Sequence, residues 1–131
     1  MLRCMTRQII TTPDAPSSPL FSQGIRSGSA LYVSGMVGVD PTTGELAGAA
    51  IDKQTTQALR NCESVLEAAG CTLADVAMVT VLLANPADFA GMNEAYATVF
   101  PTDPPARAVA RLGPELTGIL VSIAMTAHID Q

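Results

Sequence analysis

The chain has 131 residues, a length typical of one domain with its own core, and we expect residues 1–131 to form a single domain. Hydrophobic residues make up 48% of the sequence and charged residues 15%, which excludes an intrinsically disordered chain. Twelve acidic residues against seven basic ones give a net charge of −5 and no basic stripe, which argues against nucleic acid as a partner. The longest nearly apolar run, residues 76–84, is about half the length needed to span a bilayer, so we expect no membrane partner.

The cysteines and the N-terminal residues favour a reducing compartment. The first ten residues contain no apolar segment typical of a secretory signal. The three cysteines, Cys4, Cys62 and Cys71, are odd in number and lack metal-ligand spacing, and His128 is the only histidine. We therefore expect a cytoplasmic protein with reduced thiols and no bound metal.

Three strands and a helix are predicted in the first half of the chain. The β-type residues of 8–12 predict a first strand, residues 20–25 a short second strand and residues 30–37 a third, with turn residues at 26–29. Residues 51–69 predict a helix, because mostly apolar residues recur there at steps of three and four, and Gly70 is suited to end it.

The second half of the chain predicts a strand, a helix and two further strands. Residues 76–84 are nearly all apolar and rich in β-branched residues, as in a strand covered on both faces. Asn85 and Pro86 predict the start of a helix that continues to Phe100. Residues 106–112 and 118–129 predict strands, the latter from strict alternation of larger apolar residues.

The predicted order is β-β-β-α-β-α-β-β, an α/β two-layer sandwich in which two helices cover one face of a six-stranded mixed sheet. No helix is left to cover the other face, which carries small and mildly polar residues. The chain has a single lysine and few other residues that could coat a monomer. We therefore expect a homo-oligomer that packs this face against copies of itself.

Arginine is the residue type that points most directly to a ligand. No glycine-rich phosphate loop, Ser-His-Asp arrangement or paired-carboxylate motif is present. Arg107 lies near the start of a predicted apolar strand, and Arg111 follows on the same strand face, about 13 Å along. A guanidinium in apolar surroundings requires an anionic partner. Arg107 is therefore either a clamp for a small anionic ligand or a strand-end arginine that reaches water or an acidic neighbour.

A set of short motifs occurs in a characteristic order and spacing. They are Thr12-Pro-Asp-Ala-Pro16, Phe21-Ser-Gln-Gly24, Tyr32-Val-Ser-Gly35, Asp40-Pro-Thr-Thr-Gly-Glu45, Gln54-Thr-Thr-Gln-Ala-Leu-Arg-Asn61, Ala68-Ala-Gly70, Asp88-Phe89 with Asn93 and Tyr96, and Pro105-Ala-Arg107. With these motifs the chain resembles the RidA (Rid/YjgF) family over nearly its whole length, a family once labelled L-PSP endoribonuclease.

The resemblance implies a chorismate-mutase-like fold, a homotrimer and clefts between subunits. It also implies hydrolysis of 2-imino acids to 2-keto acids and ammonium, without metal or cofactor. In that reaction Arg107 would bind the substrate carboxylate. The backbone carbonyl of Val109, together with a glutamate in the last strand, would hold the attacking water.

Further residues of the cleft follow from the same resemblance. Backbone groups near Ser34 and Gly35, and an aromatic residue of the early loop, here Phe21, would line the substrate site. The asparagine of the motif corresponds to Asn93, for which we expect a mainly structural role near the site.

Two departures from the family pattern bear on activity. Counting from Arg107 without gaps places Ser122 at the position of the water-holding glutamate, whereas matching the last strand by its pattern places Leu120 there. Neither residue is a carboxylate, although serine can hydrogen-bond a water. Phe21 also lacks the hydroxyl of the tyrosine usual at its position. Loss of a general base typically costs about 10² to 10⁴ in rate.

Two functions therefore remain open. The first is a hydrolase of small imines or enamines that clamps a carboxylate with Arg107. The second is a trimer that binds a small carboxylate metabolite without turnover, or that carries out a different reaction. A ribonuclease, the older label of the family, conflicts with the acidic composition.

Overall fold

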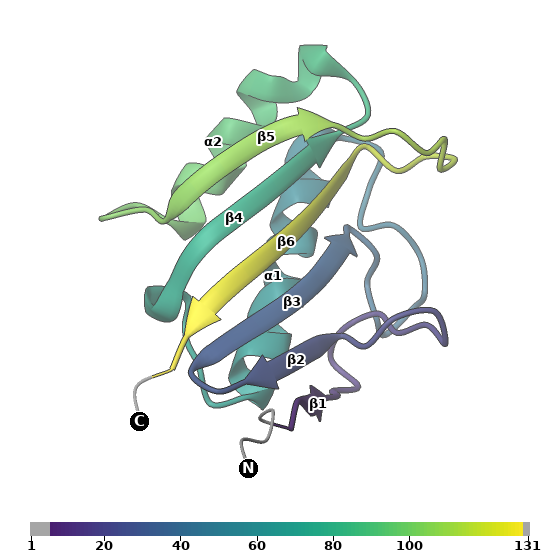
Figure 1. Ribbon diagram of the computed structural model, residues 1–131. Coiled ribbons are helices and arrows are strands. Elements are labelled where there is room, and N and C mark those ends of the chain that lie inside the picture. The colour runs from purple at the N-terminus through teal and green to yellow at the C-terminus, as the bar shows by residue number, and fades with distance from the viewer. Residues whose placement is uncertain (1–5, 130–131) are drawn as a thin grey trace.

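The computed structural model describes residues 6–129, so Cys4 lies outside the described residues. Six strands, two α-helices and two short 3₁₀-helices follow one another along the chain (Figure 1). In order they are β1 (Gln8–Ile10), β2 (Gly24–Ser27), β3 (Ala30–Val37), α1 (Ile51–Ala68), η1 (Leu73–Asp75), β4 (Val76–Leu83), η2 (Pro86–Asp88), α2 (Phe89–Val99), β5 (Ala106–Arg111) and β6 (Val121–His128).

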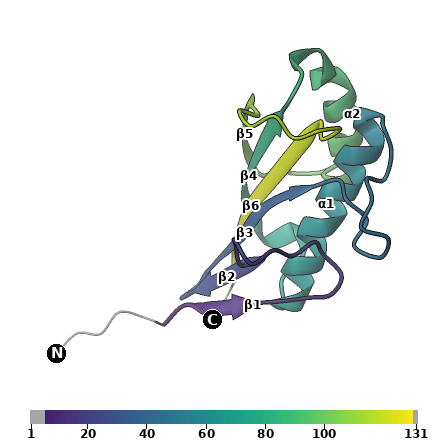
Figure 2. The ribbon, with the colours of Figure 1, turned by 90° about the vertical axis from the view of Figure 1, so that its right-hand side faces the viewer.

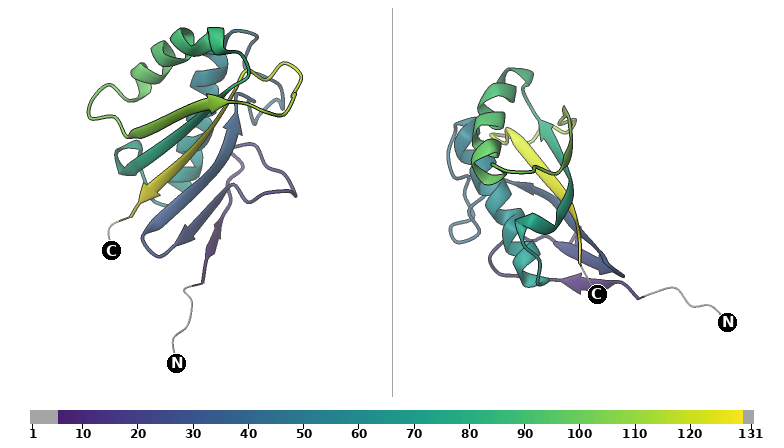
Figure 3. Two further views of the ribbon diagram at one scale, coloured as in Figure 1. Left: turned by 45° about the horizontal axis from the view of Figure 1, so that its top comes forward. Right: turned by 90° about the vertical axis from the view of Figure 1, so that its left-hand side faces the viewer.

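The strands form one mixed sheet in the order β1-β2-β3-β6-β4-β5. Only β4 and β5 run parallel, and every other neighbouring pair is antiparallel. Both helices lie on the same face of this sheet, which leaves the opposite face uncovered (Figures 2 and 3). The predicted α/β two-layer architecture, with six strands and two helices, is thereby confirmed.

The core lies between the helices and the sheet. The buried face of α1 recurs at helical spacing, and Cys62 and Val65 on this face are fully buried. Gly70 follows the helix with φ of +80°, the left-handed conformation that ends a helix at little cost for glycine. From the sheet, β6 contributes every second residue: Val121, Ile123, Met125 and Ala127 are all buried.

The alternation in β4 shows which side chains face the helices. Val79, Val81 and Leu83 are buried beneath them, whereas the intervening Thr80 and Leu82 are half-buried and face the uncovered side. Side chains of paired residues in adjacent strands share a face, so the register of β4 with β5 and β6 assigns their residues to one face or the other.

The boundaries of two predicted strands were wrong. The second strand comprises 24–27 rather than 20–25, because Gly28, with φ of +60°, and Ser29 form a tight hairpin turn that leaves Arg26 inside the strand. The last strand begins at Val121 rather than at residue 118. Gly118 has φ of +78°, and the Leu120 amide donates to the Gln54 side chain.

Two other predicted boundaries were wrong by a few residues. The first strand ends at Ile10 instead of residue 12, because the Thr12 amide donates to the Gln23 side chain. The second helix is preceded by a separate 3₁₀ turn at 86–88. Asn85 caps this turn by accepting a hydrogen bond from the Ala87 amide, as its predicted N-cap role requires.

Candidate functional site

Arg107 lies on the edge strand β5 and packs against one face of α2. Its Nη1 donates to Asn93 Oδ1 at 2.8 Å and lies 4.0 Å from the Met92 sulfur. Its guanidinium carbon is 4.8 Å from the centroid of the Tyr96 ring and 6.0 Å from that of Phe89. In α2, Phe89 and Tyr96 are each three or four residues from the adjacent pair Met92 and Asn93, so the four residues share one face of the helix. We call this arrangement the Arg107 cradle.

The cradle orients the guanidinium without neutralising it. Within residues 6–129, the hydrogen-bond partners of Arg107 are Asn93 and Met92, and both contact the same nitrogen. A guanidinium carries five N–H donors, so Nε and Nη2 remain available to a ligand. The geometry suits bidentate binding of a carboxylate or phosphate.

Tyr96 supports the arginine through the face of its ring rather than through its hydroxyl. The residue is 6% exposed, and its hydroxyl oxygen is buried without a hydrogen-bond partner. Burial raises the pKa of the phenol, although the nearby Arg107 charge opposes that rise. The hydroxyl therefore stays protonated at neutral pH, and the ring offers its negative face to the cation.

A second group of predicted site residues surrounds a β-bulge in β3. The pairing of β3 with β6 shifts between Val33 and Met36, so Ser34 and Gly35 together oppose one residue of β6. The Ser34 hydroxyl donates to the Ser22 carbonyl at 2.5 Å, which fixes the bulge to the loop that carries Phe21. Bulges of this kind are frequent beside binding sites.

Ser122 completes the second group. A Cβ placed on Gly35 would lie 2.9 Å from the Ser122 hydroxyl oxygen, so the two residues are direct neighbours. Leu120, the alternative for the glutamate position, is tied by its backbone to Gln54 and to Ala84. The geometry thus puts Ser122, and not Leu120, beside the Ser34-Gly35 bulge.

Phe21 lies in the loop before β2 and is 41% exposed. It borders an open pocket of about 420 Å³ that Ser22, Leu20 and Ile25 also line. Its ring is therefore available to a ligand or to another copy of the chain.

Arg107 and Ser122 face opposite sides of the sheet. Arg107 pairs with Val79, which is buried beneath the helices, whereas Ser122 pairs with Leu82, which faces the uncovered side. Val109 pairs with Val81 and therefore shares the face of Arg107. A single chain therefore contains two half-sites, the Arg107 cradle and the Ser34-Gly35-Ser122 group, on opposite faces of the sheet.

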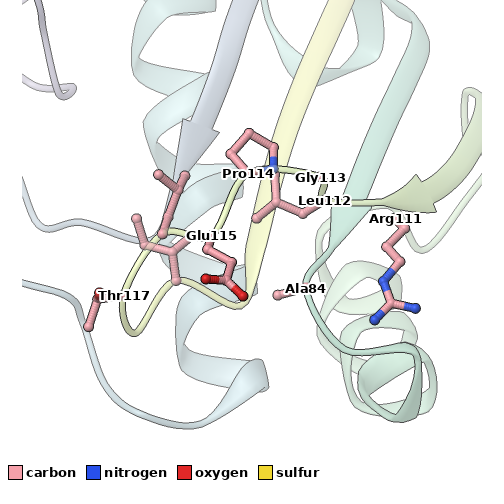
Figure 4. A pocket seen from close by; sticks show the side chains of 9 residues that line it. Ala84, Arg111, Leu112, Gly113, Pro114, Glu115 and Thr117 are labelled. Carbon is pink, nitrogen blue, oxygen red and sulfur yellow. The ribbon is translucent and has the colours of Figure 1, made fainter.

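A separate pocket of about 420 Å³ lies against the loop after β5 (Figure 4). Figure 4 shows Arg111 and Glu115 on opposite sides of this pocket, with Ala84 between them. None of the predicted site residues lines it, and its single carboxylate belongs to an exposed loop. This pocket therefore adds nothing to the two half-sites.

Cys62 and Cys71 are free and buried, and burial raises the pKa of both thiols, so neither is a reactive thiolate. Among residues 6–129, no group of three His, Cys, Asp or Glu side chains could hold a metal ion. No helix in that part of the chain is long and apolar enough to cross a membrane.

The model of the family described as Endoribonuclease L-PSP matches residues 12–129. The chain belongs to this family, the RidA family of the sequence analysis. The mouse protein named 2-iminobutanoate/2-iminopropanoate deaminase is 38% identical over 122 residues, which cover 92% of this chain and 90% of that protein.

Solved structures of RidA family members have the same fold. RidA from the Antarctic bacterium Psychrobacter sp. superposes with a TM-score of 0.87 at 34% identity, over 93% of this chain and 99% of that one. E. coli TdcF with bound serine gives 0.88 at 29% identity, over 94% of this chain and 99% of that one.

Sequence analysis missed the aromatic part of the Arg107 cradle. It placed Phe89, Met92 and Tyr96 within the helix that continues to Phe100, and quoted Phe89 and Tyr96 as motif residues, but gave none of the three a role beside Arg107. Met92 and Tyr96 are indeed buried, but all three also contact Arg107. The available signal was their spacing together with an arginine on the strand that follows the helix.

Proposed function

We propose that this protein hydrolyses 2-imino acids to 2-keto acids and ammonium, without a metal or cofactor. The observation that carries the proposal is the Arg107 cradle, which orients a guanidinium and leaves two of its nitrogens free for a carboxylate. Membership of a family that includes proteins named 2-iminobutanoate/2-iminopropanoate deaminase supports the same reaction.

Each residue of the proposal has a distinct task. Arg107 binds the substrate carboxylate and thereby fixes the position of the adjacent imine carbon. The carbonyl of Val109, two residues further on the same strand face, accepts a hydrogen bond from the attacking water. The water adds to the carbon of the protonated imine, and one proton moves from the water oxygen to nitrogen. The carbon–nitrogen bond then breaks, the remaining hydroxyl proton passes to the departing ammonia, and ammonium and a 2-keto acid are released.

We place the complete site between copies of the chain in a homotrimer. Arg107 and Val109 of one protomer would face Ser34, Gly35 and Ser122 of the next, because a single chain holds these groups on opposite sheet faces. The uncovered sheet face, with small and apolar residues at its centre, supports the assembly. Sedimentation should show one species of three times the chain mass at micromolar concentration, and a stable monomer would overturn this assignment.

Ser122 in place of a carboxylate predicts a slower enzyme rather than an inactive one. Its hydroxyl can accept a hydrogen bond from the attacking water but cannot serve as a carboxylate base. We expect a rate about 10² to 10⁴ below that of a deaminase that has the glutamate. A protonated imine is itself strongly electrophilic, so positioning of water and substrate still accelerates the reaction.

The test is a direct assay of imine hydrolysis. An amino-acid oxidase generates 2-imino acids in situ, semicarbazide competes for them, and the protein is added as wild type, Arg107→Ala or Arg60→Ala. The last variant is the control, because Arg60 is an exposed arginine on α1, away from both half-sites. We expect acceleration by the wild type and the control, but not by Arg107→Ala. No acceleration over several imino acids would refute the proposal.

A second candidate is a carboxylate-binding module without turnover. The loss of the glutamate at Ser122 and of the tyrosine hydroxyl at Phe21 favours it, since both changes remove polar groups from one proposed site while Arg107 is retained. TdcF, which binds serine in its solved structure, shows that a relative accommodates a small amino acid. A carboxylate that raises the melting temperature without product formation would support this function over hydrolysis.

A further inference from the structure

An apolar pocket begins where the Arg107 cradle ends. It has a volume of about 400 Å³, within the range of small-molecule sites, and lies between the end of β5 and the start of α2. Phe89 belongs to both features, because its ring lines the pocket and lies 6.0 Å from the guanidinium carbon of Arg107. The pocket is lined by Leu83, Pro86, Phe89, Val109, Ala110 and Arg111.

The register of β5 connects the pocket to the anion-binding arginine. Arg107, Val109 and Arg111 alternate along the strand and share the face that packs toward the helices. Val109 follows Arg107 at a distance of about 7 Å along the strand, and Arg111 follows Val109 at the same interval. A ligand whose carboxylate meets Arg107 can therefore extend over Val109 into the pocket.

The other side of the guanidinium is closed to a ligand. Met92 is fully buried and Tyr96 nearly so, and Asn93 already accepts a hydrogen bond from Nη1. On the helix-facing side of the strand, the direction that remains open to the rest of a ligand leads toward Phe89 and the pocket.

From this arrangement we infer that the pocket receives the side chain of the substrate. The inference rests on the proposed function, and it narrows the substrate class. The preferred substrates are 2-imino acids with larger apolar side chains, such as those derived from leucine, methionine or phenylalanine. A methyl or ethyl group would leave most of a 400 Å³ cavity to water.

The chemistry of the walls supports an apolar rather than an acidic side chain. Five of the six lining residues, Leu83, Pro86, Phe89, Val109 and Ala110, are apolar. Arg111 is at the far end of the shared strand face and is exposed, so its aliphatic stem can line the pocket while its charge remains in water.

The first experiment measures binding of the 2-keto acid products, independently of turnover. Dissociation constants are compared for 2-oxopropanoate, 2-oxobutanoate, 4-methyl-2-oxopentanoate, 3-phenyl-2-oxopropanoate and 2-oxopentanedioate. Affinity should rise about two- to fourfold for each added methylene, since each buried methylene contributes its transfer free energy. Equal affinity for all the monoacids, or a preference for the diacid, would overturn the inference.

A substitution in the pocket wall makes the test specific. Pro86 is exposed and occupies the first position of a helical turn, where the backbone tolerates other residues, so Pro86→Phe places a ring in the pocket at little structural cost. The variant should lose the preference for large side chains and bind 2-oxopropanoate as the wild type does. Ala87→Phe is the matched control, because it adds the same ring one residue later, outside the pocket lining.

The two proposals fail in different ways. If no imino acid is hydrolysed but the affinity gradient is present and Pro86→Phe abolishes it, hydrolysis is wrong and the side-chain pocket stands. If hydrolysis occurs but Pro86→Phe has the same substrate preference as the wild type, the pocket assignment is wrong and the enzyme proposal stands.

Discussion

Tyr96→Phe should stabilise the protein. The Tyr96 side chain is 6% exposed, and its hydroxyl is buried with no hydrogen-bond partner, so folding removes that hydroxyl from water without compensation. An unsatisfied buried hydroxyl costs about 1–3 kcal/mol. Because deletion of the oxygen leaves a small void, we expect a gain near the lower limit, about 1 kcal/mol. This corresponds to an increase in Tm of about 4 °C for a chain of this size.

The same substitution should leave anion binding unchanged. The ring that lies 4.8 Å from the guanidinium carbon of Arg107 is retained in Tyr96→Phe, and the phenol makes no hydrogen bond to it. Tyr96→Leu removes the ring and with it a cation–π contribution of about 1 kcal/mol. Carboxylate binding by that variant should therefore weaken about fivefold.

Urea unfolding measures the stability of the wild type and both variants, and binding of a 2-keto acid is measured well below their melting temperatures. Phe100, whose ring centroid is 5.0 Å from that of Tyr96, packs beside the same ring, so some loss of stability in Tyr96→Leu is expected on packing grounds alone. A destabilised Tyr96→Phe would refute the reasoning, since it would mean that the hydroxyl has a partner in the assembled protein.

Two further predictions concern stability. Gln54→Ala should lower the free energy of unfolding, measured in urea, by about 3 kcal/mol, because the fully buried amide makes three hydrogen bonds to backbone groups. The control Gln57→Ala removes one hydrogen bond from a half-buried residue and should lower it by less than about 1 kcal/mol. Burial raises the pKa of the Cys62 thiol, so the unfolded chain loses this proton first as the pH rises. The associated stability is complete below the unfolded pKa near 8.5 and declines above it by up to about 1.4 kcal/mol per pH unit, and Cys62→Ala should reduce that slope between pH 7 and pH 10.

The helices and strands were predictable where one period dominates the sequence. The strict alternation in β6 and the helical spacing in α1 each reflect one buried face, and both elements lie where this pattern places them. The predicted boundaries failed where side chains compete with the backbone for hydrogen bonds. Gln23 takes the Thr12 amide and Gln54 takes the Leu120 amide, so β1 ends early and β6 begins late.

The parts of the candidate site were predictable unequally. Residue type and an apolar strand singled out Arg107 but left two interpretations open, an anion clamp or a strand-end arginine, and its role as a carboxylate clamp came from the family resemblance. The separation of Arg107 from Ser122 could not be predicted, since it depends on the register of two strands with β4. Alternation assigns faces within a strand but does not say which face of one strand continues that of another.

The buried amides explain why the family motifs mix structural and functional residues. Gln23 donates to three carbonyls of the preceding loop, and the same loop region carries Phe21 and the Ser22 carbonyl that binds Ser34. Gln54 holds the chain that leads into β6 immediately before Ser122. Long loops have few neighbours of their own to fix them, so a rigid half-site on a loop requires side chains that satisfy its backbone.

Asn61 and Asn93 illustrate the two roles of such amides. Asn61 is fully buried and donates to the carbonyls of Val37 and Val39, at the point where β3 ends, so its task is to hold the backbone beside the bulge. Asn93 is half-buried and accepts a hydrogen bond from a side chain, that of Arg107, instead of bonding to the backbone. An exposed hydrogen bond to a guanidinium adds little stability because water competes for it. Its consequence is orientation: the bond holds Nη1, whereas Nη2 and Nε have no hydrogen-bond partner within residues 6–129 and remain available to a carboxylate.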